Sequence, residues 1–537
     1  MKNLPISIQT LSKLIKNNCV YVDKTEIAWR LVRQAGAYFL SRPRRFGKSL
    51  FVDTLKEIFE GNKALFEGLY IYDKWDWNRK FPVIKIDFAD GTLKNREELD
   101  RRIWNIMRNN AERLGVKYQK DQYSDIPGCM ADIIEQSVNT YGLGVVVLID
   151  EYDKPILDNI ESPDIALEMR EGLKNLYSVF KGQDANLQFV FMTGVSKFSK
   201  VSLFSGINQL RDITISSEFA AICGYTQSDL EHCFAQHLQS VDREKLKTWY
   251  NGYQWLGEAV YNPYDILLFI SDNFTYRNYW FETGSPDFLI KIFKQKRYFL
   301  PDLEKLELTE EILESFDIEK INPLTLLFQT GYLTIQNSFT KRGRLIFAMK
   351  IPNMEVKIAL SDKFINSYTD MVNEKIGIQD SLYSFLEKGD VEGVVGVIKR
   401  LFASIPYRNF TGNNLIESEG YYASVLYAFF SSLDAKIIPE DVTNHGQVDM
   451  TVMLRQNIYV VEIKVVDASD IDYNPALEQI QKMKYSQKYI GNKYNLYAIE
   501  SSSKKEDTAE NMEVYELGLV FSKKERNIIR ADWDKYY

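Results

Sequence analysis

Two stretches of this sequence combine residue types that bind phosphate and divalent cations. The first is FLSRPRRFGKSL, which contains Gly47, Lys48 and Ser49. At a helix start, free backbone amides attract an anion, a lysine reaches the outer phosphates of a nucleotide, and a serine hydroxyl binds Mg2+. The glycine that normally opens such a loop is replaced by Arg42. The tripeptide alone therefore leaves two interpretations open, a nucleotide site and a basic turn before a polar helix start.

An acidic pair further along the chain favours the nucleotide site. The apolar run in GVVVLIDEYDKPIL leads directly into Asp150 and Glu151, as a buried parallel strand does when it delivers carboxylates to the edge of its sheet. From that edge Asp150 can hold Mg2+ through water, and Glu151 can orient or deprotonate an attacking water. An acidic strand end can also be a solvated turn, but its position after the Lys48 motif predicts nucleotide hydrolysis.

A third strand and two arginines are further candidates for the same site. The strand in LQFVFMTGVS reaches Thr193, and Thr193 and Ser196 are predicted to sense the outermost phosphate. The alternative is that their hydroxyls cap a loop. Arg170 and Arg211 could each serve as an arginine finger, although the interpretation favoured for each is a surface ion pair.

The second stretch, GQVDMTVMLRQNIYVVEIKVV, places two carboxylates and a lysine on adjacent strands. Side chains alternate along a strand, so Glu462 and Lys464 point to the same side, and a hairpin folds Asp449 alongside them. Two such carboxylates can hold a Mg2+ ion that activates water, while the lysine positions the nucleophile. The pattern predicts hydrolysis of a nucleic-acid backbone, and the alternative is a cross-strand ion pair on a half-exposed sheet.

Two helices next to these strands supply further candidates. Glu419 precedes the apolar stripe in EGYYASVLYAFF, so we expect it to face the core, where an unpaired carboxylate is costly. Gln479 is predicted to open the next helix, close to a metal-bound water or scissile phosphate. That helix also interleaves basic and aromatic residues that could either follow a phosphate backbone and stack on bases or form a solvated face: Lys482, Lys484, Lys488, Lys493, Tyr485, Tyr489 and Tyr494.

Composition and charge narrow the class of protein. The chain has 537 residues, is 45% hydrophobic and 26% charged, and contains no apolar run of the roughly 20 residues that a membrane helix needs. Its start lacks the layout of a signal peptide, so we expect a cytoplasmic protein without membrane contact. Four cysteines without a CxxC pair and three histidines argue against a zinc cage. With a net charge of −8, any nucleic-acid contact must come from a local basic surface.

Periodicity predicts an α/β fold class with several domains, because a chain of this length exceeds what one hydrophobic core supports. Short apolar runs alternate with amphipathic helices in the N-terminal part, which indicates a parallel sheet flanked by helices, with strands at 38–41, 83–88, 145–149 and 189–193. The predicted domains are a nucleotide-binding core at 1–225, a helical lid and winged-helix-like region with a small hairpin at 226–375, and a compact α/β module at 376–537.

With these motifs in order, the chain resembles bacterial proteins in which an AAA-ATPase-like domain with a P-loop NTPase core precedes a C-terminal domain of the PD-(D/E)XK nuclease superfamily, which has a restriction-endonuclease-like fold. The resemblance covers almost the whole chain. It rests on segments that include YVDKTEIAWRLV, SRPRRFGKSL, VVLIDEYDKPIL, VYNPYDILLF, ESEGYYASVLYAFF, GQVDM, VVEIKV and ALEQI.

The resemblance implies roles for two sets of residues. The phosphate, magnesium and water roles of the nucleotide site go to Lys48, Ser49, Asp150 and Glu151. The nuclease core takes Glu419, Asp449, Glu462 and Lys464. The basic loop is the family's form of the phosphate loop, so Arg44 and Arg45 are expected to contact phosphates. The implied cofactors are ATP and Mg2+, the implied partner is nucleic acid, DNA above all, and a homo-oligomer is an open option.

Three hypotheses about function follow. The first is an ATP-hydrolysing switch or motor that controls a magnesium-dependent nuclease in the same chain, with defence or mobile-element biology as a suggested setting. The second is a nucleotide-dependent regulator that binds nucleic acid with an inactive or weakly active nuclease fold. The third is a degenerate phosphate loop without nucleotide, which leaves the nuclease-like domain to act alone or with a partner.

Overall fold

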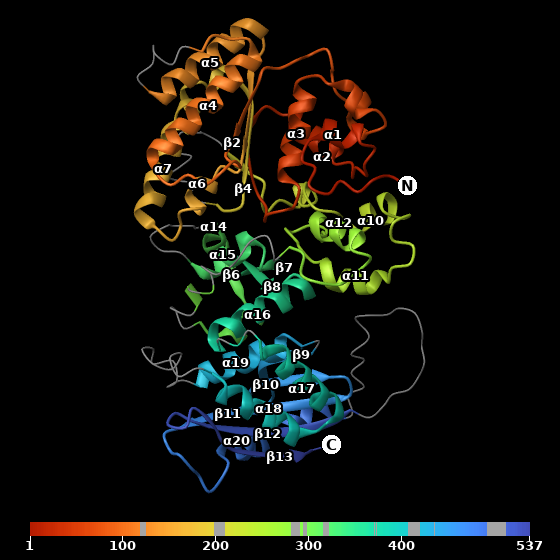
Figure 1. Cartoon of the computed structure of the whole chain (residues 1–537), viewed down its shortest axis with the longest axis vertical. Coiled ribbons are helices and arrows are strands. Elements are labelled where there is room, and N and C mark those ends of the chain that lie inside the picture. Colours follow the sequence, from red (N-terminus) through yellow and green to blue (C-terminus); the bar gives the residue numbers. More distant parts are fainter. Residues whose placement is uncertain are drawn as a thin grey trace. The chain divides into compact units, whose positions relative to one another are not determined.

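The computed structural model describes residues 1–118, 125–197, 210–280, 290, 292–293, 298–314, 322–369, 371, 373–405, 419–433, 435–490 and 512–536. Its contacts divide the chain into two compact units (Figure 1). The first comprises Met1–Asp242, Tyr250–Gly284 and Glu307–Ala348. The second comprises Arg243–Trp249, Ser285–Leu306 and Met349–Tyr537. The predicted division at residues 225 and 375 stays a prediction.

The first unit contains the predicted parallel sheet. Its strands lie in the spatial order β2-β3-β4-β1-β5 and all run parallel. They are β1 (Gly36–Ser41), β2 (Val83–Asp87), β3 (Val145–Asp150), β4 (Leu187–Gly194) and β5 (Arg211–Asp212). Every residue of β3 is buried, as its continuous apolar run requires when helices cover both faces of a sheet. The four predicted strands are confirmed, and β5 is a fifth strand that was not predicted.

Helices lie on both sides of this sheet (Figure 1). On one side are α1 (Leu11–Lys16), α2 (Thr25–Val32) and α3 (Lys48–Phe59). The other side carries α4 (Arg96–Leu114), α5 (Ile126–Tyr141), α6 (Lys154–Leu157) and α7 (Pro163–Tyr177), and α8 (Val179–Gly182) contacts α5 and α7. Short 3-10 turns lie in the connecting segments at η1 (Lys63–Phe66), η2 (Tyr70–Asp73), η4 (Asp184–Asn186) and η5 (Ser217–Phe219). This arrangement leaves the carboxyl ends of β1, β3 and β4 together at one edge.

A helical region and a small sheet follow the parallel sheet along the chain. The helices are α10 (Gln227–Cys233), α11 (Arg243–Tyr250), α12 (Pro263–Ser271), α14 (Glu310–Glu314) and α15 (Pro323–Thr330). The small sheet has the order β6-β8-β7, with β6 (Glu307–Thr309), β7 (Thr334–Lys341) and β8 (Arg344–Lys350). β7 and β8 form the predicted hairpin. The winged-helix-like character of this region stays a prediction.

The second unit contains a five-stranded sheet in the order β13-β12-β11-β10-β9, in which β11 and β12 are parallel and the other neighbours are antiparallel. Its strands are β9 (Lys436–Val442), β10 (Gln447–Leu454), β11 (Asn457–Val466), β12 (Glu513–Ser522) and β13 (Asn527–Lys535). The helical elements are η7 (Leu300–Glu304), α16 (Met354–Thr369), α17 (Lys375–Lys388), α18 (Val391–Ala403), α19 (Glu419–Ser431), α20 (Pro475–Met483) and η10 (Tyr485–Tyr489).

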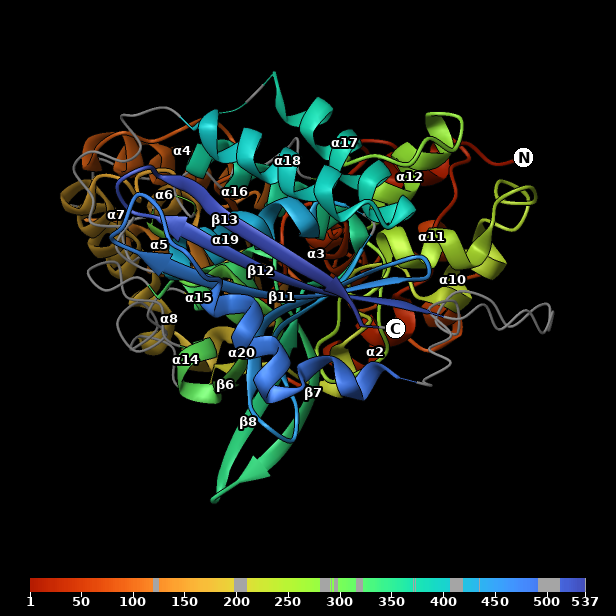
Figure 2. The ribbon, with the colours of Figure 1, turned by 90° about the horizontal axis from the view of Figure 1, so that it is seen from below.

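Helices also cover both faces of the second sheet (Figure 2). On one face, the Phe521 ring of β12 lies 4.8 Å from Phe402 of α18 and 4.4 Å from Tyr422 of α19, measured between ring centroids. On the opposite face, a Cβ placed on Gly518 would lie 2.4 Å from the backbone nitrogen of Leu477 in α20. Glycine at position 518 therefore lets α20 pack directly on the strand backbone.

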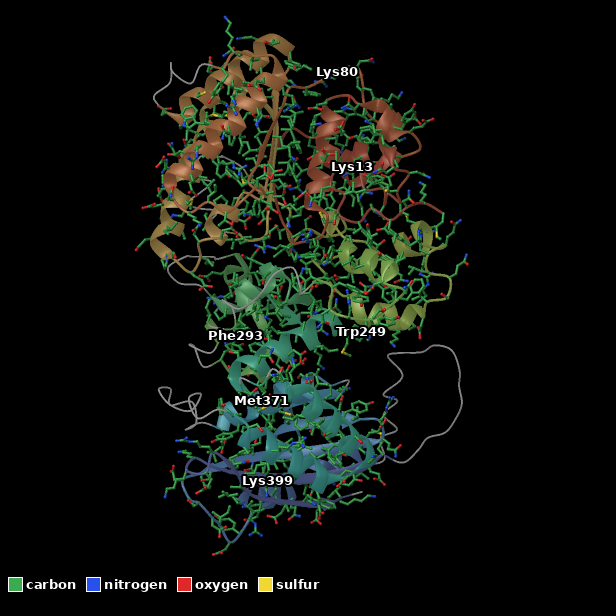
Figure 3. All side chains as sticks on the ribbon, in the orientation of Figure 1. Lys13, Lys80, Trp249, Phe293, Met371 and Lys399 are labelled. Carbon is green, nitrogen blue, oxygen red and sulfur yellow. The ribbon has the colours of Figure 1, made fainter. Side chains whose placement is uncertain are left out.

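Aromatic side chains fill much of the core of the second unit. Phe293, labelled in Figure 3, is fully buried and packs its ring 4.9 Å from Tyr298 and 5.6 Å from Phe364.

All four cysteines are free thiols, and three of them are buried. In the described residues, no helix has both the length and the apolar character that crossing a membrane requires.

Candidate functional site

The turn between β1 and α3 has the backbone that a phosphate-binding loop needs. Gly47 precedes α3 with φ of +93°, a left-handed conformation that favours glycine. A Cβ on Gly47 would meet no atom within 4 Å, so the space beside its backbone is open. Arg45 also adopts a positive φ, of 69°. The loop therefore turns tightly and directs the first free amides of α3 toward an open space.

Arg42, which stands where the first glycine of the loop is expected, anchors the loop through its side chain. Its side chain is fully buried, and its guanidinium donates to the carbonyl oxygens of Ser41 at 2.9 Å, Thr214 at 2.9 Å and Phe219 at 3.3 Å. The same group lies 4.0 Å from the centroid of the Trp255 ring, a cation–π contact. Burial lowers the pKa of Arg42 to about 10. The arginine thus fixes the loop conformation with side-chain contacts and leaves the phosphate side of the loop open.

Lys48 lies within the loop and is held by backbone oxygens. Its Nζ atom donates to the carbonyl oxygens of Arg42 and Pro43, each at 2.9 Å. The side chain is buried, and this burial lowers the pKa of the ammonium group, while Asp150 acts in the opposite direction. An incoming phosphate would offer charged oxygens in exchange for these neutral carbonyls, and hydrogen bonds between charged partners are stronger.

The acidic pair lies next to this loop, as predicted for a site at the carboxyl ends of parallel strands. Asp150 is buried and lies beside the Ser49 side chain. Burial raises the pKa of Asp150, and the neighbouring Asp87 raises it further. Burial and then Asp150 raise the pKa of Glu151, whose backbone has a positive φ of 50°. The hydroxyl and carboxylate oxygens of Ser49 and Asp150 are ligands suited to Mg2+, so these residues fit that ion.

Thr193 and Ser196 both contact the protein rather than open space. The Thr193 hydroxyl donates to the carbonyl oxygen of Leu40 at 2.9 Å. The Ser196 hydroxyl donates to Asp153 at 2.5 Å, and the backbone nitrogen of Ser196 donates to the same carboxylate at 2.6 Å. Asp153, which sequence reasoning missed, thereby ties the end of β4 to the turn after β3. The role of both hydroxyls as phosphate sensors stays a prediction.

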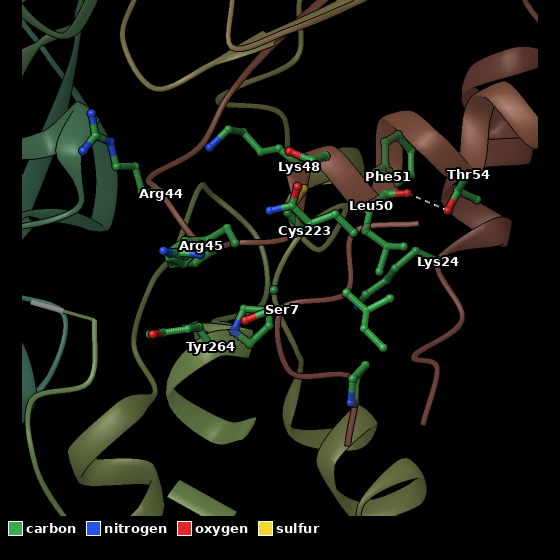
Figure 4. A pocket seen from close by; sticks show the side chains of 18 of the residues that line it. Ser7, Lys24, Arg44, Arg45, Lys48, Leu50, Phe51, Thr54, Cys223 and Tyr264 are labelled. Atoms are coloured by element: carbon green, nitrogen blue, oxygen red, sulfur yellow. Dashed lines mark hydrogen bonds between the residues drawn. The ribbon is translucent and has the colours of Figure 1, made fainter. Parts of the chain in front are cut away.

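The four arginines considered for the site fall into two groups. Arg44 and Arg45 are exposed and line the cavity beside the loop, with the Arg45 guanidinium 4.9 Å from the centroid of the Tyr264 ring (Figure 4). A guanidinium nitrogen of Arg170 lies 3.1 Å from a carboxylate oxygen of Glu171, and the same kind of pair joins Arg211 and Glu218 at 3.9 Å. Neither of the latter two lines the cavity, so within this chain they are placed as surface ion pairs.

The loop opens into a cavity of about 440 Å3 within the first unit. Beside the loop, α3 and the turn after β3, its walls include three segments that sequence reasoning did not assign to the site: Pro5 to Lys24 in part, Ile222 to Tyr225, and α12 with Pro263 and Tyr264. The volume lies within the range of small-molecule and cofactor sites. These segments carry no phosphate-binding motif, so nothing in their residue types alone could have placed them here.

The second constellation also assembles as predicted. The Asp449 carboxylate accepts from the backbone nitrogen of Ile463 at 2.7 Å, and the Glu462 carboxylate accepts from the backbone nitrogen of Asp449 at 3.3 Å. Lys464 donates to Glu462 at 2.8 Å. Burial, and then the nearby Asp449 charge, raises the pKa of Glu462 to about 7, and burial raises the pKa of Asp449. Two charged carboxylates this close together repel each other, and a cation between them would reduce that repulsion.

These two carboxylates fit a Mg2+ ion, which usually takes one or two protein carboxylates and completes its shell with water and phosphate oxygens. Among the described residues, no group of three His, Cys, Asp or Glu side chains is placed to hold a metal.

Glu419 and Gln479 differ from their predicted positions. Glu419 does not face the core: its side chain is 49% exposed, with its carboxylate 4.0 Å from the Lys464 ammonium. The first turn of α19 is the rim of the site, and this explains why the carboxylate stays solvated. Gln479 lies on the second turn of α20, which begins at Pro475, and its amide donates to the Tyr485 hydroxyl at 3.4 Å. Its catalytic role stays a prediction.

The proposed stacking surface after α20 is wrong for two of its tyrosines. Tyr485 and Tyr489 are buried in a core cluster with Val448 and Ile458, so their rings cannot stack on bases. Lys488 pairs with the buried Asp441 and donates to the carbonyl oxygen of Val442 at 3.1 Å. Lys482 and Lys484 are exposed, while Lys493 and Tyr494 lie outside the described residues.

Comparison with known proteins gives two partial matches and one nearly complete match. Residues 5–204 match a family described as a predicted AAA-ATPase, and residues 417–510 match the PD-(D/E)XK nuclease superfamily. An uncharacterized protein in the vnfD 5' region of Azotobacter chroococcum mcd 1 is 41% identical over 529 residues, which is 98% of each chain. No solved structure matches this chain.

Proposed function

We propose, from the premise that this chain belongs to the family of AAA-ATPase-like proteins with a C-terminal PD-(D/E)XK nuclease superfamily domain, that it hydrolyses ATP and thereby controls a nuclease in the same chain. The observation that carries the ATPase part is the convergence of Lys48, Ser49 and Asp150, in which the buried Asp150 carboxylate at the strand end lies beside the Ser49 side chain and near the Lys48 charge. Nucleotide hydrolysis requires these three groups within reach of one triphosphate.

Each residue of the nucleotide site has a task in this proposal. Lys48 exchanges the carbonyl oxygens of Arg42 and Pro43 for phosphate oxygens. Ser49 and Asp150 supply oxygen ligands for Mg2+, an ion that neutralises charge on the phosphates when it is bound. Glu151 orients the attacking water, and the raised pKa of its carboxylate makes it a better proton acceptor.

The tasks in the second unit follow from the same kind of geometry. Asp449 and Glu462 would hold Mg2+, which supplies Lewis-acid stabilisation of a phosphodiester when it is bound. Lys464 is hydrogen-bonded to Glu462 and so is held at the site, where its ammonium group can orient a water nucleophile or neutralise charge on the scissile phosphate. Glu419, exposed at the rim, places its carboxylate 4.0 Å from the same ammonium group.

One observation favours the alternative of a nucleotide-dependent regulator that binds nucleic acid and cuts it weakly or not at all. In the described part of the chain no group of three His, Cys, Asp or Glu side chains is placed to hold a metal, and the third carboxylate near the second site, that of Glu419, lies at its exposed rim. An ion held by so few protein groups depends on the substrate for its remaining ligands, and such a site can bind a backbone without completing hydrolysis.

Two substitutions with matched controls test the proposal. Lys48→Ala should lower ATP turnover by on the order of 100-fold, and the exposed Lys80→Ala should leave it unchanged. Asp449→Ala should abolish magnesium-dependent cleavage of DNA and keep ATP turnover, and the exposed Asp470→Ala should keep both. Strong ATP turnover without cleavage of any DNA or RNA form would support the alternative. Absence of ATP binding at millimolar concentration would contradict both.

A further inference from the structure

The β7–β8 hairpin has a long exposed tip. Its strands are joined by the two residues Arg342 and Gly343, both with positive φ, of 53° and 76°, as in the tight turns that suit twisted hairpins. Residues 336–345 are all exposed, and Figure 2 shows the two strands extending away from the small sheet. Exposed strand edges of this length tend to associate with another molecule. The side chains of the hairpin therefore indicate the chemistry of its partner.

The charge of the hairpin is opposite to that of the whole chain. Residues 334–350 contain four basic residues, no acidic residue, and two exposed apolar side chains near the tip, namely Lys341, Arg342, Arg344, Lys350, Phe339 and Leu345. Lys341 lies 3.0 Å from Glu307, whereas Arg342 and Arg344 have no acidic partner within the described part of the chain. The net charge of the chain is −8, so this tip is a local basic surface.

The shape and charge of the hairpin fit duplex DNA. The major groove of B-DNA admits a two-stranded ribbon, and basic side chains at its tip would contact phosphates on either side. The helix before the hairpin is excluded from this role, because six of the eight residues of α15 are buried and none is charged. The hairpin itself is therefore the part of this region that can reach a groove.

The root of the hairpin is bonded to the segments that hold the phosphate loop. The Thr334 hydroxyl accepts from the backbone nitrogen of Gln254 at 2.7 Å and donates to its carbonyl oxygen at 3.1 Å. The next residue, Trp255, stacks on the Arg42 guanidinium. The first residue of β7 is thus connected to the anchor of the loop through two neighbouring residues.

A second set of contacts joins the same two places. The indole nitrogen of Trp280 donates to the carbonyl oxygen of Arg44 at 3.3 Å, and its ring lies 5.1 Å from the ring of Tyr332. A Cβ on Gly331 would lie 2.8 Å from Cγ of Pro43, so the loop packs against the backbone that leads into β7. Any shift of residues 42–44 must therefore be accommodated at residues 331–334.

We propose that the β7–β8 hairpin binds duplex DNA and that ATP at the phosphate loop changes its affinity for DNA. The inference rests on the proposed function, since it takes the loop to bind ATP. Phosphate binding draws the Lys48 ammonium from the carbonyl oxygens of Arg42 and Pro43, and the loop then adjusts against Trp255 and Trp280. By linkage, DNA on the hairpin must change the affinity for ATP by the same factor.

Fluorescence anisotropy with a labelled DNA duplex tests the binding surface. The double variant Arg342→Asn, Arg344→Thr keeps residue types that suit the turn and the strand, and it should weaken DNA binding by roughly tenfold or more at about 0.1 M salt. The slope of log affinity against log salt should fall by about 1 for each phosphate that the variant no longer neutralises. The control Arg101→Thr, Arg108→Thr removes the same charge from the exposed face of α4 and should bind DNA like the parent protein.

The coupling is tested in the same samples with a non-hydrolysable ATP analogue and Mg2+. The analogue should change the DNA affinity of the parent protein by about fivefold or more. Trp280→Phe removes the donor to Arg44 and should reduce this change to less than half, whereas Trp77→Phe, which removes a similar indole–carbonyl bond to Tyr72, should not. Analogue binding is measured separately, so a protein that fails to bind it contradicts the proposed function. A protein that binds the analogue but shows equal DNA affinity in the hairpin variant and its control overturns the inference.

Discussion

The ammonium group of Lys48 lies 2.9 Å from the carbonyl oxygen of Arg42, so the lysine of the phosphate loop is held by the residue that replaces the loop's first glycine. The carbonyl of Arg42 faces Lys48 while its guanidinium faces Thr214, Phe219 and Trp255. A glycine at this position would permit the turn but could not anchor it. The side-chain contacts of Arg42 therefore fix the conformation of this loop, whereas a glycine would only permit it.

Arg42→Gly should destabilise the first unit although it restores the usual loop glycine. The change leaves the carbonyl oxygens of Thr214 and Phe219 without their donor, removes the cation–π contact, and opens a void beside Trp255. Broken buried hydrogen bonds and a cavity together cost about 2 to 5 kcal/mol. Thermal unfolding should show a clear drop relative to Arg44→Gly, because Arg44 is exposed. Equal melting temperatures for the two variants would refute the anchoring role.

Gly47→Ala separates the backbone requirement from the ligand requirement. Alanine at φ of +93° costs about 1 kcal/mol of stability, and its methyl group would stand in the open space beside the loop. Gly115→Ala is a matched control, since Gly115 also has a positive φ with nothing within 4 Å and ends α4 away from the cavity. Both should lose similar stability, but only Gly47→Ala should weaken ATP binding in a titration. Equal ATP affinity in both would place the phosphates elsewhere.

The stability of the second unit should depend on the protonation of Glu462. Its pKa is about 7 in the folded protein against an ordinary 4.5, so between these values the folded state keeps a proton that the unfolded state loses. The free energy of unfolding therefore falls as pH rises from about 4.5 to 7, by roughly 3 kcal/mol at most, and is level above that range. Glu462→Gln should remove this dependence, which urea unfolding of parent and variant at pH 5 and pH 8 would measure.

Magnesium should act on the same group in the opposite direction. A cation beside Asp449 and Glu462 stabilises both carboxylates in their charged forms, so it lowers the pKa of Glu462. Mg2+ should therefore raise the melting temperature more at pH 8 than at pH 5, and this difference should disappear in Glu462→Gln. If Mg2+ stabilises parent and variant equally at both values, the ion binds somewhere else.

The parts of the fold that could be predicted are those in which one local pattern decides the outcome. The apolar run before Asp150 had to be a buried strand, and the alternation around Glu462 and Lys464 had to place both on one side. β5 could not be predicted in this way, since it is two polar residues that pair with the free edge of β1. Its existence depends on a partner far away in the sequence.

The errors at the second site have a similar cause. In α19 nearly every residue is buried, so its apolar pattern does not define which face Glu419 occupies. Tyr485 and Tyr489 follow α20 among lysines, and a basic stretch gives no sign that its aromatic residues close a core. The walls of the cavity beside the loop could not be predicted from local patterns either, because Pro5 to Lys24 and α12 carry no phosphate-binding motif.

The contact between Arg42 and Trp255 also bears on how such loops change over evolutionary time. A buried guanidinium without its aromatic partner destabilises the fold, and an indole ring that faces a glycine leaves a cavity. A substitution at one of the two positions alone is therefore unfavourable. Homologous chains should therefore carry both residues or replace both. A sequence pattern that requires glycine at the first position of the loop excludes proteins of this kind. A pattern that allows either glycine, or arginine together with tryptophan at the position of Trp255, includes them.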